Sequence, residues 1–341
     1  MWCLQRQTAN LTVKFSSCMA NIILLRLLAV HIQTHADVVA VGDLRIFTRK
    51  EDILGAGSFG TVFKGQWREK ACAAKVLSPL GQEVLTGIPI TQQAVIPKEM
   101  LQKFRRECEF MRDCQHPNIV TYYDTLLYPK CNLPVLVMEL MQASLSRYIE
   151  DKGVDMSLVI QISLCRDVAS ALEFLHGRNL IHRDLCSDNV LVNNCLHIPV
   201  AKVSDFGISR MIVKPEQLSH TLTLFGHREG YLPREAFSYP ADYDASLDIF
   251  MLGVIMILIA QSVPTVKTKR ERQKLVIKLG EHPLKPCIHQ CLSEKKEERC
   301  AAGELYDDLT SLLSSVSTSR LTTREKPNTA TDNGMHSKSG V

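Results

Sequence analysis

Short runs in which apolar and polar positions alternate dominate the first half of the chain. Three of them, 44–54, 61–67 and 70–77, are separated only by short polar breaks. Two more cover 119–127 and 134–140. A period of two places every second side chain on the same face, which is typical of a half-buried strand. The pattern therefore predicts strands over these runs.

One segment among these runs has helical periodicity instead. From residue 99 to residue 114 the apolar positions recur three or four residues apart, at Met100, Leu101, Phe104, Cys108 and Met111. The tripeptide His116-Pro117-Asn118 ends this predicted helix. The stretch before it, 78–98, holds three prolines and two glycines, so we expect a loop there.

Beyond Ser144 the pattern becomes mostly helical. The predicted helices cover 145–150, 158–176 and 245–260, followed by weaker ones to Leu313. Strands first and helices later indicate an α+β fold of two lobes. We place the smaller lobe at about 44–141 and the larger one at about 142–314.

The two ends of the chain differ in composition from this central part. The first 36 residues contain no Asp or Glu, and their apolar run, 22–30, is interrupted by Arg26. It is shorter than the roughly 20 apolar residues of a spanning helix, so no membrane segment is predicted, and a signal or transit peptide is the alternative. We expect 1–43 to be a disordered or partly helical extension. Residues 315–341, rich in Ser, Thr, Asn, Lys and Gly, are predicted to be disordered.

Composition excludes some classes of function. The net charge is only +4 in 341 residues, which argues against a dedicated nucleic-acid binder, since such a protein needs a concentrated basic face. The twelve cysteines include no Cys-x-x-Cys pair. Free thiols in a reducing compartment are favoured over a disulfide framework, and this points to the cytoplasm. The oligomeric state is not indicated.

A glycine-rich stretch follows the first strand run. Gly55, Gly57 and Gly60 form a Gly-x-Gly-x-x-Gly pattern. In dinucleotide-binding folds this pattern leads into a helix, but here Thr61-Val62-Phe63 continues as a strand. The pattern therefore predicts a hairpin that folds over the phosphates of a nucleotide. An ordinary tight turn is the alternative.

Lys75 lies in the middle of an apolar strand run. A charge there is costly unless it is paired, or unless the strand is an edge strand and the amine reaches water. The helix at 99–114 offers two carboxylates, Glu107 and Glu109. Glu107 shares a helical face with Phe104 and Met111, so we predict that Glu107 is the partner. Paired in this way, Lys75 could bind the phosphates of a nucleotide.

Two tetrapeptides supply acid and metal chemistry. In the first, 182–185, Asp184 could accept a proton from a substrate hydroxyl. Asn189 follows five residues later, and Asp205 lies in the second, 204–207. An Asn and an Asp can hold Mg²⁺ through hard oxygen ligands. Their order and spacing after the glycine pattern and Lys75 argue against chance.

These motifs together resemble those of the eukaryotic protein kinases. The resemblance runs from about Leu44 to about Leu313. Within the family the chain is most similar to the tyrosine-kinase-like group of serine/threonine kinases, in the stretches LGAGSFGTVFKGQWREKACAAKVL, HPNIV, LPVLVMEL and HRDLxSDNVL. The resemblance implies a bilobal fold with a small β-rich N-lobe, one regulatory helix and a larger helical C-lobe.

The resemblance also assigns nucleotide contacts. The phosphate-covering loop would comprise Gly55, Ala56, Gly57, Ser58 and Gly60. Adenine would lie between Val62, Ala73 and Leu191, with Met138 as gatekeeper and the backbone of Glu139 to Met141 as hinge.

The same resemblance assigns the chemistry and its supports. Asp184 would be the catalytic base, Lys75 paired with Glu107 the phosphate-binding cation, and Asn189 and Asp205 the Mg²⁺ ligands. Arg183 would pair with a phosphate on the activation segment, 205–235, with Ser219, Thr221 and Thr223 as candidate acceptors. Further expected contacts are Asp248 with the catalytic loop from below and Glu235 with Arg299.

Three positions depart from the family pattern. Cys186 stands where serine/threonine kinases carry a Lys that neutralises the γ-phosphate, His227 replaces the Thr of a Gly-Thr pair, and Arg234 replaces the middle Pro of the Ala-Pro-Glu motif. Loss of one cation beside an anionic transition state costs on the order of 10²–10³ in rate. A protonated His227 could restore part of it.

The sequence therefore predicts an ATP- and Mg²⁺-dependent kinase that acts on Ser or Thr, with Tyr also open, of protein substrates. The alternative is an ATP-binding pseudokinase that serves as a scaffold or allosteric partner. A small-molecule kinase of similar fold is a third interpretation. The enzyme is favoured because the five residues that catalysis requires are all present: Lys75, Glu107, Asp184, Asn189 and Asp205.

Overall fold

The computed structural model describes residues 38–57, 60–77, 98–128, 133–152, 156–193, 198–206, 210–211, 229–237 and 244–324. The chain divides into two compact units. The first comprises Met1–Gln142 with Val203–Arg210, and the second Ala143–Lys202 with Met211–Val341. The α+β arrangement predicted from the order of strands and helices is confirmed.

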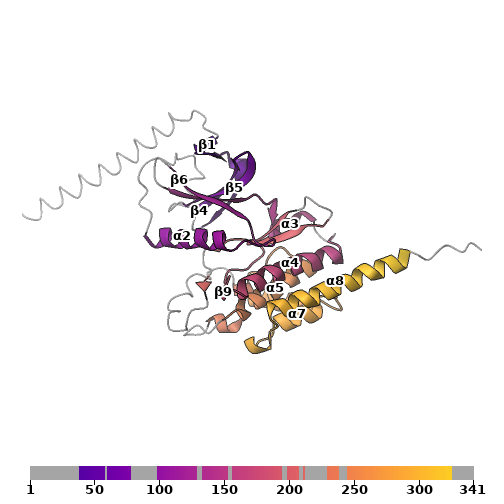
Figure 1. Ribbon diagram of the computed structural model, residues 1–341. Coiled ribbons are helices and arrows are strands. Elements are labelled where there is room, and N and C mark those ends of the chain that lie inside the picture. Colours follow the sequence, from indigo (N-terminus) through magenta and orange to yellow (C-terminus); the bar gives the residue numbers. More distant parts are fainter. Residues whose placement is uncertain are drawn as a thin grey trace, which may run out of the picture. The chain divides into compact units, whose positions relative to one another are not determined.

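The first unit is built on an antiparallel sheet beside one helix (Figure 1). Its described strands follow the order β1-β2-β4-β5-β7-β6, and β3 pairs with β4. The bounds are β1 (Val38–Val41), β2 (Leu44–Phe47), β3 (Ile53–Gly57), β4 (Gly60–Trp67), β5 (Lys70–Leu77), β6 (Tyr122–Tyr128), β7 (Leu133–Glu139), the 3₁₀ turn η1 (Lys50–Asp52) and helix α2 (Lys98–Asp113).

Alternation along the strands builds the core of this unit. The buried side chains on one face form a cluster of Val41, Leu44, Ile46, Phe63, Cys72, Ala74, Val76, Val135 and Val137. Strand β5 is buried from Cys72 to Leu77, and it is a central strand, since it pairs with β4 on one edge and with β7 on the other. Lys75 therefore lies in a central strand, and the edge-strand alternative is wrong.

A short segment from later in the chain belongs to the first unit. The N–H of Val203 donates to the carbonyl of Asn118 (2.8 Å), and the N–H of Val120 donates to the carbonyl of Val203 (3.0 Å). The sequence prediction placed these residues in the second lobe with the rest of 142–314. Periodicity could not show this pairing, because it joins segments more than 80 residues apart.

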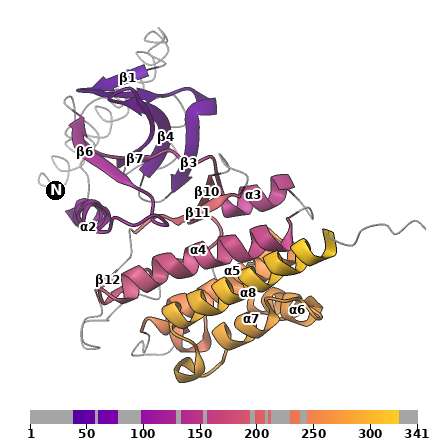
Figure 2. The ribbon, with the colours of Figure 1, turned by 45° about the vertical axis from the view of Figure 1, so that its right-hand side comes forward.

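The second unit is mainly helical. Its helices are α3 (Leu145–Lys152), α4 (Leu158–His176), α5 (Ser246–Gln261), α6 (Lys269–Lys278), α7 (Lys285–Cys291) and α8 (Ala302–Arg324), with 3₁₀ turns η6 (Glu229–Tyr231), η7 (Arg234–Phe237) and η8 (Lys296–Glu298). Short strands are β8 (Ala143–Ser144), β9 (Leu180–Ile181), β10 (Val190–Asn193), β11 (Val200–Val203) and β12 (Arg210–Met211). Figure 2 shows α8 running alongside α4.

Helix α5 forms the centre of the second unit. It is apolar on all sides, and every residue from Leu247 to Ile259 is buried, as expected for a helix surrounded by others. Its one buried charge is Asp248. No described helix combines the length and apolar character needed to cross a membrane.

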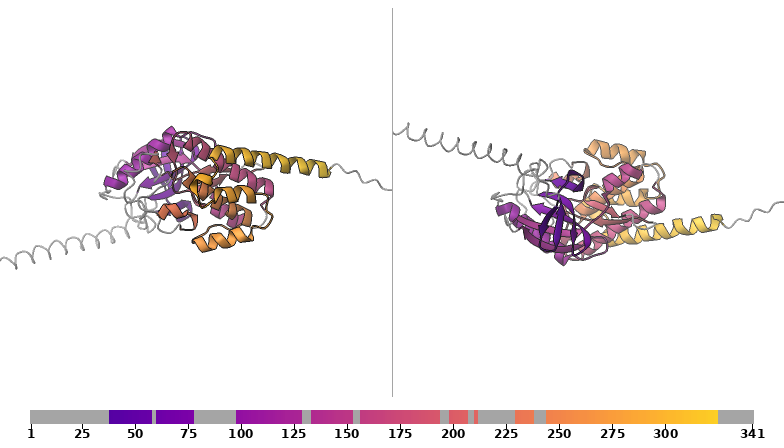
Figure 3. Two further views of the ribbon diagram at one scale, coloured as in Figure 1. Left: turned by 90° about the horizontal axis from the view of Figure 1, so that it is seen from below. Right: turned by 90° about the horizontal axis from the view of Figure 1, so that it is seen from above.

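The predicted domain boundaries need two corrections. Helix α8 continues to Arg324 beyond the predicted boundary at 314, and Figure 3 shows its C-terminal end running past the other helices. Two hydroxyl groups near this end donate hydrogen bonds to the helix backbone. Ser317 Oγ and Thr318 Oγ1 donate to carbonyls four residues earlier (2.8 and 2.9 Å). The prediction of disorder from polar composition is therefore wrong for residues 315–324, which are helical. At the other end, β1 lies within the predicted 1–43 extension, because its backbone pairs with β2.

Candidate active site

The first unit holds a buried cation between two carboxylates. Lys75 is 7% exposed. Its Nζ lies 2.6 Å from Glu107 Oε1 and 3.2 Å from Asp205 Oδ1. The contact with Glu107 rather than Glu109 is the one predicted from the phase of the helix, since Glu107 is buried with Phe104 on the inner face of α2.

The electrostatics of this cluster keep the lysine charged. Burial alone would lower the pKa of Lys75, but the nearby Glu107 and Asp205 carboxylates outweigh it and raise the pKa. The ammonium group is therefore a fixed positive charge at neutral pH.

Asp205 has a left-handed backbone conformation, with φ of 60°. For a residue other than glycine this costs about 1–2 kcal/mol and is kept only where the surroundings hold it. The Lys75 contact supplies one restraint. The next residue supplies another, because the Phe206 ring stacks on Phe110 of α2 at 4.7 Å between centroids. Phe110 was not among the predicted site residues, since α2 offers several apolar positions and the sequence does not show which one meets Phe206.

The predicted glycine hairpin is present. Strands β3 and β4 pair antiparallel up to Gly57 and Gly60, and β4 continues without a helix. At Gly60 a Cβ would overlap the carbonyl of Val76, so a side chain is excluded there by close backbone approach, whereas a Cβ at Gly55 would meet open space. Gly55 and Ala56 are exposed, and Ser58 lies outside the described residues.

The strands behind this hairpin carry the other predicted nucleotide contacts of the first unit. Val62 pairs with Lys75, and Ala73, which is buried, pairs with Met138. Glu139 exchanges bonds with Thr121: its N–H donates to the Thr121 carbonyl (2.9 Å), and its carboxylate accepts from the Thr121 N–H and hydroxyl (3.1 and 2.8 Å). Met141 is buried.

In the second unit, Asp248 holds the loop that contains Asp184. Its carboxylate accepts hydrogen bonds from the backbone N–H groups of His182 and Arg183, both at 2.8 Å, and contacts His176 Nε2 at 3.0 Å. Burial alone would raise the pKa of Asp248, but these hydrogen bonds and the neighbouring imidazoles lower it. The predicted contact from below the loop is therefore present, while His176 was not anticipated.

Asp184, which is half-buried, and Asn189, which is buried, contact each other in this loop. The Asn189 amide nitrogen donates to the Asp184 carbonyl (2.7 Å) and to its carboxylate (3.2 Å). Arg183, which precedes Asp184 and whose N–H donates to Asp248, has φ of 72° and is 1% exposed. Leu191, predicted to support adenine, pairs with Ser144 on β8 and is half-buried.

Comparison with known proteins identifies the family of the chain. The family model described as protein tyrosine and serine/threonine kinase matches residues 48–309. The chain belongs to this family. The kinase domain resembles serine/threonine-protein kinase Wnk of Drosophila melanogaster, with 29% identity over 80% of this chain and 11% of that protein. It also resembles dual specificity protein kinase shkC of Dictyostelium discoideum (27%; 73% of this chain, 46% of that protein) and serine/threonine-protein kinase CTR1 of Arabidopsis thaliana (30%; 60% and 22%).

The chain thus spans less than half the length of these relatives. The prediction that it is a member of the protein kinase family is confirmed by the family match.

The unusual Cys186 of the kinase domain is 2% exposed. The next residue ties the loop to other parts of the second unit: Ser187 Oγ donates to the Pro264 carbonyl (2.7 Å) and lies 2.9 Å from the Tyr231 hydroxyl. Tyr231 is a support that sequence reasoning missed, because a lone Tyr near a Pro-Arg-Glu motif has no distinguishing pattern. His227 and the candidate phosphate acceptors Ser219, Thr221 and Thr223 lie outside the described residues.

The kinase domain also contains the predicted pair of Glu235 with Arg299. Arg299 Nη1 donates to Glu235 Oε1 (2.5 Å) and to the Ser246 carbonyl (3.2 Å), and Nε donates to the Ser293 carbonyl (2.9 Å). The guanidinium lies over the Phe250 ring of α5. Arg299 thereby connects the end of the activation segment to the helical core.

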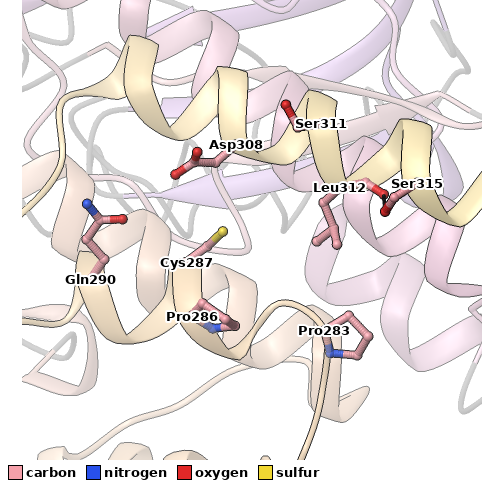
Figure 4. Close-up of a pocket in the computed structure, with 8 residues that line it drawn as sticks. All are labelled: Pro283, Pro286, Cys287, Gln290, Asp308, Ser311, Leu312 and Ser315. Atoms are coloured by element: carbon pink, nitrogen blue, oxygen red, sulfur yellow. Dashed lines mark hydrogen bonds between the residues drawn. The ribbon is translucent and has the colours of Figure 1, made fainter.

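A separate hollow of about 420 Å³ lies between α7 and α8 (Figure 4). It is lined by Pro283, Pro286, Cys287, Gln290, Asp308, Ser311, Leu312 and Ser315. None of these belongs to the predicted catalytic or nucleotide-binding residues, so the hollow is not part of the candidate active site.

Proposed function

We propose that this kinase domain transfers the γ-phosphate of ATP to Ser or Thr residues of protein substrates. The observation that carries the proposal is the buried Lys75–Glu107 pair with Asp205 beside it. A buried ion pair of this kind costs desolvation energy that an apolar pair would avoid. Phosphoryl transfer requires such a fixed cation, since its catalysis is mostly positioning and charge stabilisation.

Lys75 is the cation for the phosphates of ATP. Because Glu107 holds the amine at 2.6 Å and the pKa of Lys75 is raised by the two carboxylates, it needs neither to be protonated nor reoriented when the anion binds. Asp205 accepts from the same amine, which keeps its carboxylate next to the phosphate-binding charge.

Asp184 is the base that accepts the proton of the substrate hydroxyl. The residue is half-buried, and Asn189 donates to both its carbonyl and its carboxylate. This hydrogen bond orients the carboxylate, while Asp248 holds the preceding two residues by their N–H groups. Orientation of the base within hydrogen-bonding reach of the hydroxyl is the requirement for general-base catalysis.

The donor chemistry fits Mg²⁺. A carboxylate, Asp205, and an amide oxygen, Asn189, are hard oxygen ligands, and the amide nitrogen of Asn189 is the end that is engaged with Asp184. When bound, Mg²⁺ would neutralise charge on the transferring phosphate. Among the described residues no group of three or more His, Cys, Asp or Glu could hold a metal by itself, which is consistent with a site that the phosphates help to form.

The backbone near Glu139 is suited to adenine. Its N–H group is used by Thr121 within the sheet, so a contact from Glu139 to the base would come from its carbonyl. Val62 and Ala73 of the first unit and Leu191 of the second would supply apolar surface for the ring, as the resemblance to the kinase family implies, and the exposed Gly55 and Ala56 belong to the strand that would cover the phosphates.

Specificity for Ser or Thr over Tyr rests on the relatives. Two of the three described above are named serine/threonine kinases, and one is named a dual specificity kinase. Cys186 removes the residue that would separate the classes, so we assign Ser and Thr as the main acceptors and keep Tyr as a measurable second activity. Arg183, buried beside Asp248, is proposed to bind a phosphate on the activation segment.

The thiols favour a reducing compartment. None of the eight cysteines in the described part of the chain forms a disulfide, and all eight are buried, which supports the proposal of a cytoplasmic protein.

The test is an ATP/Mg²⁺ assay of the full chain on generic protein substrates. Asp184→Asn keeps the size of the side chain but removes the base, and we expect the rate to fall by at least about 10². Asp307→Asn, an exposed Asp on α8, is the matched control and should not change the rate. ATP binding without any phosphate transfer by the unaltered protein would contradict the proposal and indicate the scaffold instead.

A further inference from the structure

Two buried cysteines face each other near the Arg299 contacts. Cys291 is the last residue of α7, and Cys300 follows η8 just before α8. Their sulfur atoms are 3.9 Å apart, and the residues are 0% and 4% exposed. Neither residue has a role in the proposed phosphate transfer.

The surroundings hold one partner more firmly than the other. Cys291 packs against α5 at Gly253, where an added Cβ would lie 2.7 Å from the Cys291 Cβ. Glycine therefore allows α7 to approach α5 closely. Cys300 lies in the short connection between η8 and α8, a type of segment that shifts more readily than a packed helix.

The two thiols also differ in acidity. The contact between the two sulfurs, in which either can donate the hydrogen bond, lowers the pKa of Cys300 and raises the pKa of Cys291. The thiolate is the reactive form of cysteine. Cys300, which lies in a connection and is 4% exposed where Cys291 is 0% exposed, is therefore assigned as the attacking sulfur and Cys291 as the resolving one.

We propose that Cys291 and Cys300 are a modification site at which a hydroperoxide forms a disulfide. The Cys300 thiolate attacks a peroxide oxygen, the O–O bond breaks, and Cys300 becomes a sulfenic acid as one water is released from hydrogen peroxide. The Cys291 sulfur then attacks the Cys300 sulfur, the S–O bond breaks, and the second water leaves. Two thiols are oxidised to one disulfide and one peroxide is reduced to two waters.

The bond would disturb the contacts of Arg299. A disulfide needs the sulfurs at about 2.0 Å, so the pair must close by roughly 2 Å from its present separation. Arg299 immediately precedes Cys300 in the chain. Its side chain makes hydrogen bonds of 2.5–3.2 Å to Glu235, Ser246 and Ser293. Hydrogen bonds weaken steeply when stretched, so a shift of Cys300 loosens the Arg299–Glu235 pair.

This consequence for activity rests on the proposed kinase function, but the disulfide itself does not. The full chain is treated with hydrogen peroxide, then digested with trypsin without reductant. Lys295, Lys296 and Arg299 lie between the two cysteines, so the disulfide joins two separate peptides that mass spectrometry can recognise.

The expected result is a Cys291–Cys300 linked peptide that disappears after dithiothreitol treatment. Cys287→Ala is the matched control: Cys287 lies one turn earlier on the same helix and at the α7–α8 hollow (Figure 4), and its loss should leave the linked peptide in place. Absence of the link in the unaltered protein, or a link that uses Cys287 instead, overturns the proposal.

Two further measurements test whether the disulfide disturbs the contacts of Arg299. Oxidation should increase hydrogen exchange of the backbone at 229–237, and it should lower phosphate transfer at least about tenfold, reversibly and only in proteins that retain Cys300. Loss of activity to the same degree in Cys300→Ala would overturn the coupling. A chain without any phosphate transfer would refute the kinase proposal alone, since the linked peptide and the exchange at 229–237 are measured without it.

Discussion

The two units hold the residues proposed for catalysis by different interactions. In the first, charged side chains hold one another: Lys75 lies between Glu107 and Asp205. In the second, one buried carboxylate, Asp248, accepts from two backbone N–H groups of the loop before Asp184, and the Asn189 amide donates to Asp184.

The difference shows which kind of substitution should destabilise each unit most. Removing one charge from the first unit leaves another buried charge without its partner, which costs far more than the pair contributes. In the second unit the loop depends on acceptor oxygens aimed at N–H groups, so geometry and donor–acceptor polarity matter more than net charge. The second unit is also the place where the family cation is missing, at Cys186.

The largest expected effect follows from removing the cation of the first unit. Lys75→Met should lower phosphate transfer at least about 10³-fold and destabilise the protein by about 3–5 kcal/mol, because Glu107 stays buried without its partner. Adding Glu107→Gln should restore most of the stability, measured by urea unfolding, but none of the rate. Recovery of rate in the double variant would show that Lys75 acts only as a structural partner.

The corresponding change in the second unit is Asp248→Asn. The amide keeps the shape, but its NH₂ group must face one of the two backbone N–H groups that the carboxylate accepts from, so we expect a loss of about 3 kcal/mol and a fall in rate as the Asp184 loop loosens. Because the folded-state pKa of Asp248 is lowered, its contribution is complete above about pH 4 and is lost as the pH falls through the folded-state pKa. The stability gap between the two proteins, measured by urea unfolding, should therefore narrow in acid; a constant gap would contradict this account.

A smaller effect on the rate is expected when a positive charge is introduced at position 186. Cys186→Lys should raise the rate about tenfold, since the long stem can leave the buried position while its amine reaches toward solvent. Cys186→Met, of similar length and without charge, is the matched control and should not gain activity. Equal rates for the two variants would mean that the loop does not lack a cation.

The smallest effect concerns a neutral histidine of the second unit. His282 Nδ1 accepts from the Leu284 N–H (3.2 Å), so Nε2 is the donor to Gln161 Oε1 (3.0 Å). Burial lowers the pKa of His282, so its stabilising contribution is complete above about pH 6.5 and declines as the pH falls toward the folded-state pKa.

Because His282 is partly exposed, we expect this change to be under about 1 kcal/mol. Thermal unfolding between pH 7 and pH 5 measures it. The slope should flatten in His282→Gln and stay unchanged in His289→Gln, which alters an exposed residue on α7. The same slope in both variants would assign the pH dependence to other groups.

Local patterns were sufficient for the parts of the site that lie within one element. The helical phase of Glu107 with Phe104 and Met111 selected the partner of Lys75, and the strand residues after Gly60 predicted a hairpin. The roles of Phe110, His176 and Tyr231 could not be predicted in this way. Each is an ordinary residue of its own element and acquires its contact only from a segment far away in sequence.

The sequence by itself determined the class of fold and the family, and it predicted the residues proposed for phosphate transfer, because periodicity and motif spacing are local properties of the chain. Only the tertiary structure decided that residues 203–206 join the first unit, that α8 extends to Arg324, and that Cys291 faces Cys300. Strand pairing and side-chain contacts depend on which distant segments of the chain come together. Local composition and periodicity do not show which segments these are.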